Sequence, residues 1–258
     1  MRSIGPAALA LAAALPFAAP APAAEIKVMN SGGFTAAYKD LAPGCERATG
    51  NTVETAWGAS MGNAPDAIPM RLARGEPADV LIMAAPALDQ MIAEGKAVAG
   101  SRVDLAHSSI AMAVRAGAPK PDIGSVEAFR RALMEAPSIA YSASASGVYL
   151  STEVFPRLDP SGAIMAKSRR ILSERVGAVV ARGEAEIGFQ QLSELLPIEG
   201  IDIVGPLPAE LQRVTVFSAG VAANAKEPDA ARALIACLAA PEAAPAIRKS
   251  GLEPAPAR

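Results

Sequence analysis

Five short stretches place small or polar residues between the end of an apolar, strand-like run and the start of a helical pattern. They are "NSGGF" (30–34), "GASMGN" (58–63), "SASASGVY" (142–149), "LSERVG" (172–177) and "GFQQLSE" (188–194). In open α/β sheets, ligands bind at the carboxyl ends of strands. The free N–H groups at a helix start attract anions. The sequence therefore predicts an anion-binding cleft formed by these stretches.

Three serines and two glycines in these stretches are the first candidates for contact with the anion. Ser31, Ser60 and Ser146 are placed so that their hydroxyls join the helix-start amides. A serine before a helix is also a common N-cap, which is the alternative for each one. Gly32 and Gly33 remove side chains from the first turn, so we expect them to let the ligand approach the backbone N–H groups. A tight turn alone is the alternative for this pair.

The elements that position these stretches alternate along the chain. Strand-like runs cover residues 25–30, 52–58, 78–85, 109–117, 138–143 and 185–191. Helical patterns cover residues 34–50, 63–76, 87–95, 125–136, 148–158 and 175–184. Gly50 closes the first of these helices as a C-cap. Alternation of this kind predicts an α/β fold with mainly parallel sheets.

The first 24 residues have the pattern of a secretory signal peptide. Arg2 precedes an apolar run over residues 4–19, and Ala21, Pro22 and Ala23 form a small-x-small cleavage site. We therefore expect cleavage near Ala23 and export to the periplasm, with the mature chain folding as one large domain or two smaller ones.

Composition limits the partners and cofactors of the chain. A net charge of −2 argues against a nucleic-acid partner. One histidine and two cysteines leave almost no ligands for a zinc or iron site, so we expect no metal. The chain also lacks a P-loop and a Gly-x-Gly-x-x-Gly turn, so we expect no nucleotide cofactor. Export would permit a disulfide between Cys45 and Cys237, and two buried free thiols are the alternative.

Several long segments resemble one family of receptors. They are "IKVMNSGGFTAAYKDLAPGCERATGNTVETAWGASMG", "RLARGEPADVLIMA", "GVYLSTEVF", "GEAEIGFQQLSE" and "PDAARALIACLAAPEAAPAIRKSGLEP". Together they are similar to the periplasmic molybdate-binding type of ABC-transporter solute receptor. The resemblance implies a two-lobed type II periplasmic binding protein fold with two crossovers. One lobe would comprise residues 25–105 plus 213–258, and the other residues 106–212. It also implies a monomer that binds a small anion and an ABC-transporter membrane component as partner.

The same resemblance assigns ligand contacts to Ser31, Ser60, Ser146, Val176 and Gln191. The adjacent residues Gly32, Gly147 and Gln190, together with Arg71, complete the predicted set. Ser146 stands where the family tends to have alanine, and Gln191 where it has a tyrosine hydroxyl. An oxyanion without protons needs only donors, whereas a glutamine amide both donates and accepts. The sequence therefore predicts a di- or tricarboxylate rather than molybdate. Two strand glutamines facing opposite sides are the alternative.

A narrower resemblance raises an enzymatic alternative. The strings "SGGFTAAY", "YSASASGVY" and "GFQQLSELLP" are similar to periplasmic aconitate isomerases. That resemblance implies a cofactor-free 1,3-proton shift between cis- and trans-aconitate, which needs a base and groups that hold carboxylates.

Glu194 and Tyr149 are the candidate catalytic residues, and Arg71 is a candidate carboxylate ligand. A glutamate at a helix start also complements the helix dipole, and Arg71 on a helix surface is also a solvated residue. His107 fits a surface or hinge position. No catalytic signature is present and the whole-chain resemblance is to receptors, so the sequence places solute binding first and the isomerase second.

Overall fold

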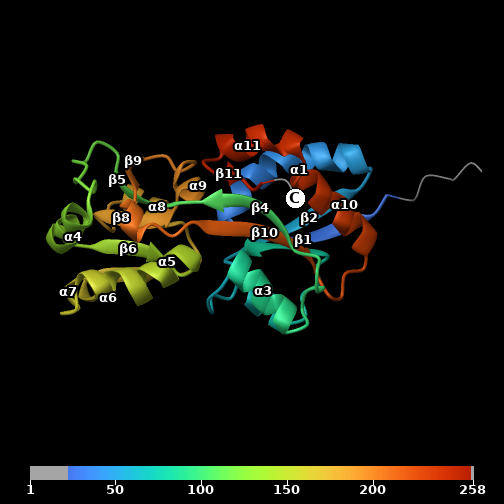
Figure 1. Ribbon diagram of the computed structural model, residues 1–258, viewed down its shortest axis with the longest axis horizontal. Helices are drawn as coiled ribbons and strands as arrows, with labels where there is room; N and C mark the ends of the chain where they lie inside the picture. Colours follow the sequence, from blue (N-terminus) through green and yellow to red (C-terminus); the bar gives the residue numbers. More distant parts are fainter. Residues whose placement is uncertain (1–22, 257–258) are drawn as a thin grey trace, which may run out of the picture.

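The computed structural model describes residues 23–256 and divides them between two β-sheets that lie end to end in an elongated molecule (Figure 1). The signal peptide predicted over residues 1–24 lies, up to residue 22, outside the described residues.

The first sheet contains strands from both ends of the chain. They are β1 (Glu25–Ser31), β2 (Thr52–Gly58), β3 (Val80–Ala84), β4 (Val103–Ser108), β10 (Thr215–Val221) and β11 (Glu253–Pro254). Their spatial order is β11-β4-β10-β3-β1-β2. β1 pairs in parallel with β2 and β3, whereas β10 runs antiparallel to β3 and β4. The strands predicted over residues 25–30, 52–58 and 78–85 are confirmed.

The second sheet is built from the middle of the chain. Its strands are β5 (Ile110–Arg115), β6 (Ile139–Ser142), β7 (Ser168–Ile171), β8 (Ile187–Gln191) and β9 (Ile201–Pro206). Their spatial order is β7-β6-β8-β5-β9. β6 is parallel to β7 and β8, and β5 is antiparallel to β8 and β9.

Helices cover both sheets. The α-helices are α1 (Thr35–Thr49), α2 (Ile68–Ala73), α3 (Ala85–Ala93), α4 (Val126–Glu135), α5 (Ala145–Tyr149), α6 (Phe155–Leu158), α7 (Ala163–Ala166), α8 (Val176–Ala181), α9 (Leu192–Leu195), α10 (Pro228–Leu238) and α11 (Ala244–Lys249). Short 3₁₀ turns are η1 (Gly32–Phe34), η3 (Ala209–Leu211) and η4 (Pro241–Ala243), and η2 (Leu150–Val154) is a π-helical turn. Gly50 caps α1 in the left-handed conformation, with φ of 72°, as the sequence predicts.

No single helix within residues 23–256 is long and apolar enough to cross a membrane; α10 and the segment Pro241–Lys249 pass that test only as a pair bent by 56°.

The chain passes between the sheets twice. β4 belongs to the first sheet and β5 to the second, and the chain returns from β9 to β10. In Figure 1, β4 and β10 lie side by side and reach toward the second sheet. These passages make both sheets mixed rather than mainly parallel, because β5 and β10 enter their sheets against the direction of their neighbours. We propose that the sheets with their helices form the two predicted lobes, with boundaries at residues 108–110 and 206–215.

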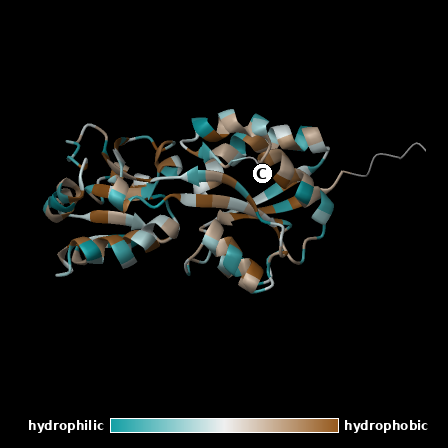
Figure 2. Ribbon diagram, viewed as in Figure 1, coloured by the Kyte–Doolittle hydropathy of each residue, from teal (hydrophilic) through white to brown (hydrophobic). Residues whose placement is uncertain are grey.

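Alternation along the strands gives each sheet a hydrophobic core on both faces. In β1, Ile26 and Val28 pack on the α1 and α10 side, whereas Met29 packs with Leu88 of α3 on the opposite side. In the second sheet, Phe189 of β8 belongs to the core formed with α4 and α6. Figure 2 shows this pattern as largely hydrophobic strands beneath helices of mixed hydropathy. The carboxyl ends of β1 and β8 therefore stay fixed by packing on two sides.

A disulfide joins the two ends of the chain. Cys45 of α1 and Cys237 of α10 are bonded, with their Cα atoms 5.8 Å apart and a sequence separation of 192 residues. Of the two alternatives that the sequence left open, a disulfide or two buried free thiols, the structure has the disulfide.

The double substitution Cys45→Ser/Cys237→Ser tests the contribution of this bond. A crosslink closing a long loop restricts the unfolded chain, so the variant should lose about 2–5 kcal/mol of unfolding free energy in urea titrations. Reductant should lower the wild-type midpoint and leave that of the variant unchanged. Equal midpoints for the variant and the oxidised wild type would contradict this expectation.

Candidate functional site

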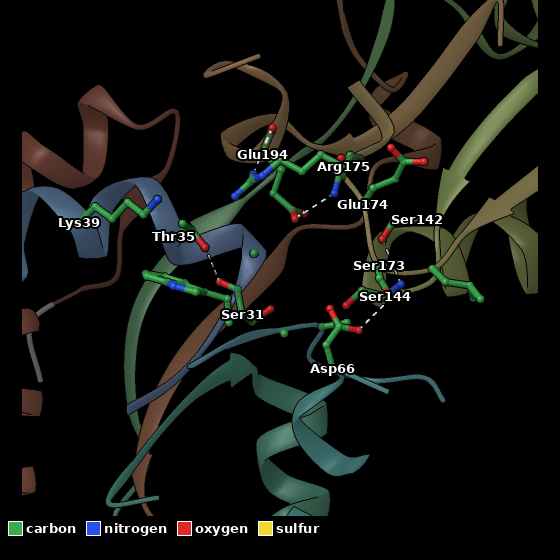
Figure 3. Close-up of a pocket in the computed structure, with 16 residues that line it drawn as sticks. Ser31, Thr35, Lys39, Asp66, Ser142, Ser144, Ser173, Glu174, Arg175 and Glu194 are labelled. Carbon is green, nitrogen blue, oxygen red and sulfur yellow. Dashed lines mark hydrogen bonds between the residues drawn. The ribbon is translucent and has the colours of Figure 1, made fainter. Parts of the chain in front are cut away.

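A cavity of about 220 Å³ lies between the two sheets (Figure 3). It is smaller than the roughly 300–1,000 Å³ of drug-sized ligand sites, which suits a small metabolite. Its lining comes from both proposed lobes: Ser31, Gly32, Thr35, Lys39, Trp57, Gly58, Ala59 and Asp66 from the first, and Ser142, Ser144, Leu172, Ser173, Glu174, Arg175, Gln190 and Glu194 from the second.

The two glycines after β1 are required by close approach. A Cβ at Gly32 would lie 2.0 Å from Glu194 Oε1, and one at Gly33 would lie 2.1 Å from the Phe217 ring. Neither glycine has a positive φ. The tight-turn alternative therefore does not explain them. The group that approaches Gly32 in this structure is the carboxyl of Glu194.

Ser31 receives a hydrogen bond that leaves its own proton available. The backbone N–H of Ala84 donates to Ser60 Oγ over 2.8 Å, and Ser60 Oγ donates to Ser31 Oγ over 2.7 Å. Ser31 makes no side-chain capping bond to the helix that follows it. Since Ser31 lines the cavity and Ser60 is buried behind it, this relay directs the Ser31 hydroxyl proton toward a ligand.

Glu194 is held by a second chain of hydrogen bonds. The backbone N–H of Val176 donates to Gln190 Oε1 over 2.9 Å, and Gln190 Nε2 donates to Glu194 Oε1 over 2.9 Å. Both side chains are buried, with Glu194 8% and Gln190 4% exposed. Glu194 is the third residue of α9 and lines the cavity.

Burial raises the pKa of Glu194 to about 7, from an ordinary value of 4.5. Desolvation of the carboxylate is the main cause. The positive charge of Arg175 and the hydrogen bonds from Gln190 and the Gln191 backbone act in the opposite direction. Glu194 is therefore a carboxyl group that can exchange a proton with a cavity-bound molecule near neutral pH.

Two cations of the lining have no ion-pair partner among the described residues. Lys39 Nζ lies 5.1 Å from the centroid of the Trp57 ring, and Arg175 Nη1 donates only to the backbone oxygen of Glu194, over 3.3 Å. Lys39 belongs to α1 and Arg175 precedes α8, so they approach the cavity from different lobes. Two such cations are suited to separate carboxylates of one ligand.

Hydrogen bonds connect the lobes around the cavity. Ser173 Oγ donates to Asp66 Oδ1 over 3.0 Å, and Ser193 Oγ donates to the carbonyl oxygen of Gly33 over 2.7 Å. The first of these is visible in Figure 3 beside the cavity. These bonds join residues of the two lobes directly across the edges of the cavity.

Of the predicted site residues, Ser31, Gly32, Gln190 and Glu194 line the cavity and Ser60 lies directly behind Ser31.

The predicted residues of α5 and α8 stand apart from the cavity. Ser146 and Gly147 are buried in α5 and do not line it; Ser142 and Ser144 of the same stretch do. Gly147 packs against β6, because a Cβ there would lie 1.6 Å from the Ser142 carbonyl oxygen. The backbone N–H of Val176 is already bonded to Gln190.

The other predicted residues point elsewhere. Gln191 Nε2 donates to Thr215 Oγ1 over 2.8 Å, and its Oε1 is buried without a partner. The Tyr149 hydroxyl donates to the Leu211 carbonyl oxygen over 3.0 Å. Arg71 forms an ion pair with Glu76 and His107 lies within β4; neither lines the cavity.

Sequence reasoning missed the two cations. Lys39 follows Thr35 at a spacing of four residues on α1, and both line the cavity because that spacing places side chains on one helix face. Arg175 stands in "LSERVG", a stretch that the sequence identified without selecting this residue. Within residues 23–256, no group of three or more His, Cys, Asp or Glu side chains is arranged to hold a metal ion.

Comparison with known proteins identifies relatives over nearly the whole chain. Residues 26–253 match the model of the bacterial extracellular solute-binding protein family. An aconitate isomerase of a Pseudomonas species is 52% identical over 248 residues, covering 96% of this chain and 95% of that protein. The molybdate-binding protein ModA of Azotobacter vinelandii is 30% identical, covering 94% of this chain and 95% of that protein.

A solved structure supports the same fold. The periplasmic molybdate-binding protein of Azotobacter vinelandii superposes with a TM-score of 0.70 at 21% identity, covering 90% of this chain and 100% of that one. This match establishes the two-lobed binding-protein fold.

The raised pKa of Glu194 predicts a pH-dependent stability. A folded-state pKa near 7 against 4.5 means that stability is fully present below pH 4.5 and is lost as the pH rises through about 7. Glu194→Gln does not titrate, so its unfolding free energy relative to the wild type should rise by about 2–3 kcal/mol between pH 5 and pH 8. Urea titrations at both pH values measure this difference.

Glu174→Gln is the matched control, because Glu174 is an exposed carboxylate of the same cavity that pairs with Arg182. Its relative stability should change little between the two pH values. A pH-independent difference for Glu194→Gln would show that the buried carboxyl titrates normally.

Proposed function

The chain belongs to the family of bacterial extracellular solute-binding proteins, and on that premise we propose that it binds a tricarboxylate and isomerises it in the periplasm as an aconitate isomerase. The observation that supports this most directly is the buried, proton-exchanging carboxyl of Glu194 at the wall of a cavity lined by two unpaired cations. The 52% identity to an aconitate isomerase supports the same proposal.

The reaction moves one proton and one double bond. Glu194 as carboxylate takes a proton from the methylene carbon beside the double bond, and the electron pair of that C–H bond spreads over the allylic system and its carboxylates. The protonated Glu194 then donates a proton to the far carbon of the allylic unit. This is either the abstracted proton itself or one that has exchanged onto the carboxyl. Atoms and charge balance without any change in oxidation state, so the step requires no redox cofactor.

The cations and hydroxyl of the cavity hold the substrate and stabilise the charge that develops. Arg175 and Lys39 would bind carboxylates from the two lobes, and Ser31 would donate its free hydroxyl proton. Hydrogen bonds to charged groups are worth about 1.5–3 kcal/mol each. Such contacts become stronger as negative charge moves onto the carboxylates in the transition state.

Solute delivery is the second candidate function. It is supported by the family match over residues 26–253 and by the relatives that bind molybdate. In that case the protein, acting as a monomer, would capture a di- or tricarboxylate and pass it to an ABC-transporter membrane component.

The placement of the two cations favours a polycarboxylate over molybdate in either case. Lys39 and Arg175 approach the cavity from different lobes, so each can bind a separate carboxylate of one ligand, whereas molybdate carries its charge on one compact ion.

Proton NMR of purified protein with trans-aconitate tests the enzymatic proposal. Cis-aconitate should form with a turnover on the order of 1–10³ per second. Glu194→Gln should slow it by about 10²–10⁴-fold, because the general base is lost, while Glu76→Gln, at a carboxylate outside the cavity, should retain most of the activity. Binding without turnover would leave solute delivery as the function.

Trp57 provides an independent measurement of binding. It is the single tryptophan of the chain, is 38% exposed and lines the cavity, so its fluorescence should respond to a bound ligand. Aconitate or citrate should bind, and Arg175→Gln should weaken binding by about 10–100-fold through loss of a charge-assisted contact. Arg182→Gln, outside the cavity, is the matched control. A response to molybdate or tungstate alone would contradict both candidate functions.

A further inference from the structure

The hydrogen-bond chain behind Glu194 has only one possible direction. The backbone N–H of Val176 is a donor and cannot accept, so the Gln190 group facing it must be the amide oxygen. This orients the rest of the amide, and Nε2 must point to Glu194 Oε1. Since the NH₂ group donates and never accepts, Glu194 Oε1 must act as an acceptor.

The two carboxyl oxygens of Glu194 are therefore not equivalent. Oε1 is held between Gln190 Nε2 and the Cα of Gly32, where even a methyl group does not fit. A proton on Oε1 would face the N–H of Gln190. Oε2 is the oxygen that neither the Gln190 amide nor Gly32 approaches, and the Gln191 backbone N–H also bonds to the carboxyl group.

We infer that Gln190 is a positioning residue that fixes Glu194 Oε1 as a hydrogen-bond acceptor and leaves Oε2 as the single oxygen that exchanges the substrate proton. The inference rests on the proposed isomerisation for its functional meaning. Proton abstraction and return from one fixed oxygen would keep the base at one face of the allylic system.

Few other charges face Glu194. Of the elements packed on α9, η1, β8 and α8 carry no titratable side chain within their bounds. α1 contributes Lys39 to the cavity, and Arg175 lies just before α8. β5 contributes only Arg115, at its far end from Gln191. Asp66 and Glu174 complete the charged lining.

Substitutions at residue 190 should move the Glu194 titration in a graded way. Gln190→Met keeps the length of the side chain and removes the donor, which stabilised the charged carboxylate. The midpoint should rise by about 1–2 pH units, the equivalent of one hydrogen bond to a charged group. Gln190→Glu places a second carboxyl beside Oε1, and like charges should raise the midpoint further.

Gln191→Met is the matched control, because the neighbouring glutamine on the same strand bonds to Thr215 instead. It should leave the Glu194 midpoint unchanged. Carboxyl ¹³C NMR of the ligand-free, glutamate-labelled protein measures each midpoint, and the Glu194 signal is the one absent from Glu194→Gln. Circular dichroism checks that each variant is folded.

The midpoint of the pH profile of kcat/KM for aconitate should rise in the same order, from the wild type to Gln190→Met to Gln190→Glu. In both variants kcat should fall by a larger factor than KM changes. An unchanged midpoint in both folded residue-190 variants would overturn the inference. If aconitate is not turned over, the proposed function fails, and the NMR midpoints still decide whether Gln190 controls the Glu194 proton.

Discussion

The burial of the Glu194 carboxyl between Gly32 and Gln190 is the constraint on which the rest of the site depends. Gly32 belongs to the turn after β1 of the first sheet, and Gln190 to β8 of the second. The carboxyl thus occupies the junction of two lobes, where any side chain on residue 32 would displace it. Burying a carboxylate costs stability, and a core residue at this position would avoid that cost. Folding stability alone therefore does not favour a carboxyl group at this position.

A bound polycarboxylate would give the two cations of the cavity the ion-pair partners that the described residues do not supply. Lys39 and Arg175 line the cavity without an ion-pair partner among the described residues, and Glu194 near neutral pH is divided between its two protonation states. A polycarboxylate would neutralise the cations and favour protonation of Glu194. Ligand charge and the proton of Glu194 are therefore coupled through a few ångströms of low-dielectric space.

Sequence patterns predicted the fold well because packing on both sheet faces leaves a clear signal. Alternation in β1 and the glycine after α1 fixed where elements begin and end. Four of the candidate site residues that the sequence offered line the cavity: Ser31, Gly32, Gln190 and Glu194. It could not decide which of two adjacent strand glutamines faces the cavity, since a register change of one residue exchanges them. Here Gln190 faces the cavity and Gln191 faces Thr215.

Long cationic side chains were missed for a related reason. Lys39 is exposed and Arg175 is half-buried, and both residue types are common on any protein surface. They line the same cavity only because the two lobes lie against each other. The same contact between the lobes gives Glu194 its raised pKa, because Gly32 and the first lobe remove water from the carboxyl. If the lobes separated, hydration would return that pKa toward its ordinary value and the cations would part. Under the proposed function, closure of the lobes around a ligand would therefore also assemble the proton-exchanging group. A solute-binding scaffold that closes on its ligand can therefore acquire acid–base chemistry by placing one carboxyl where the lobes meet.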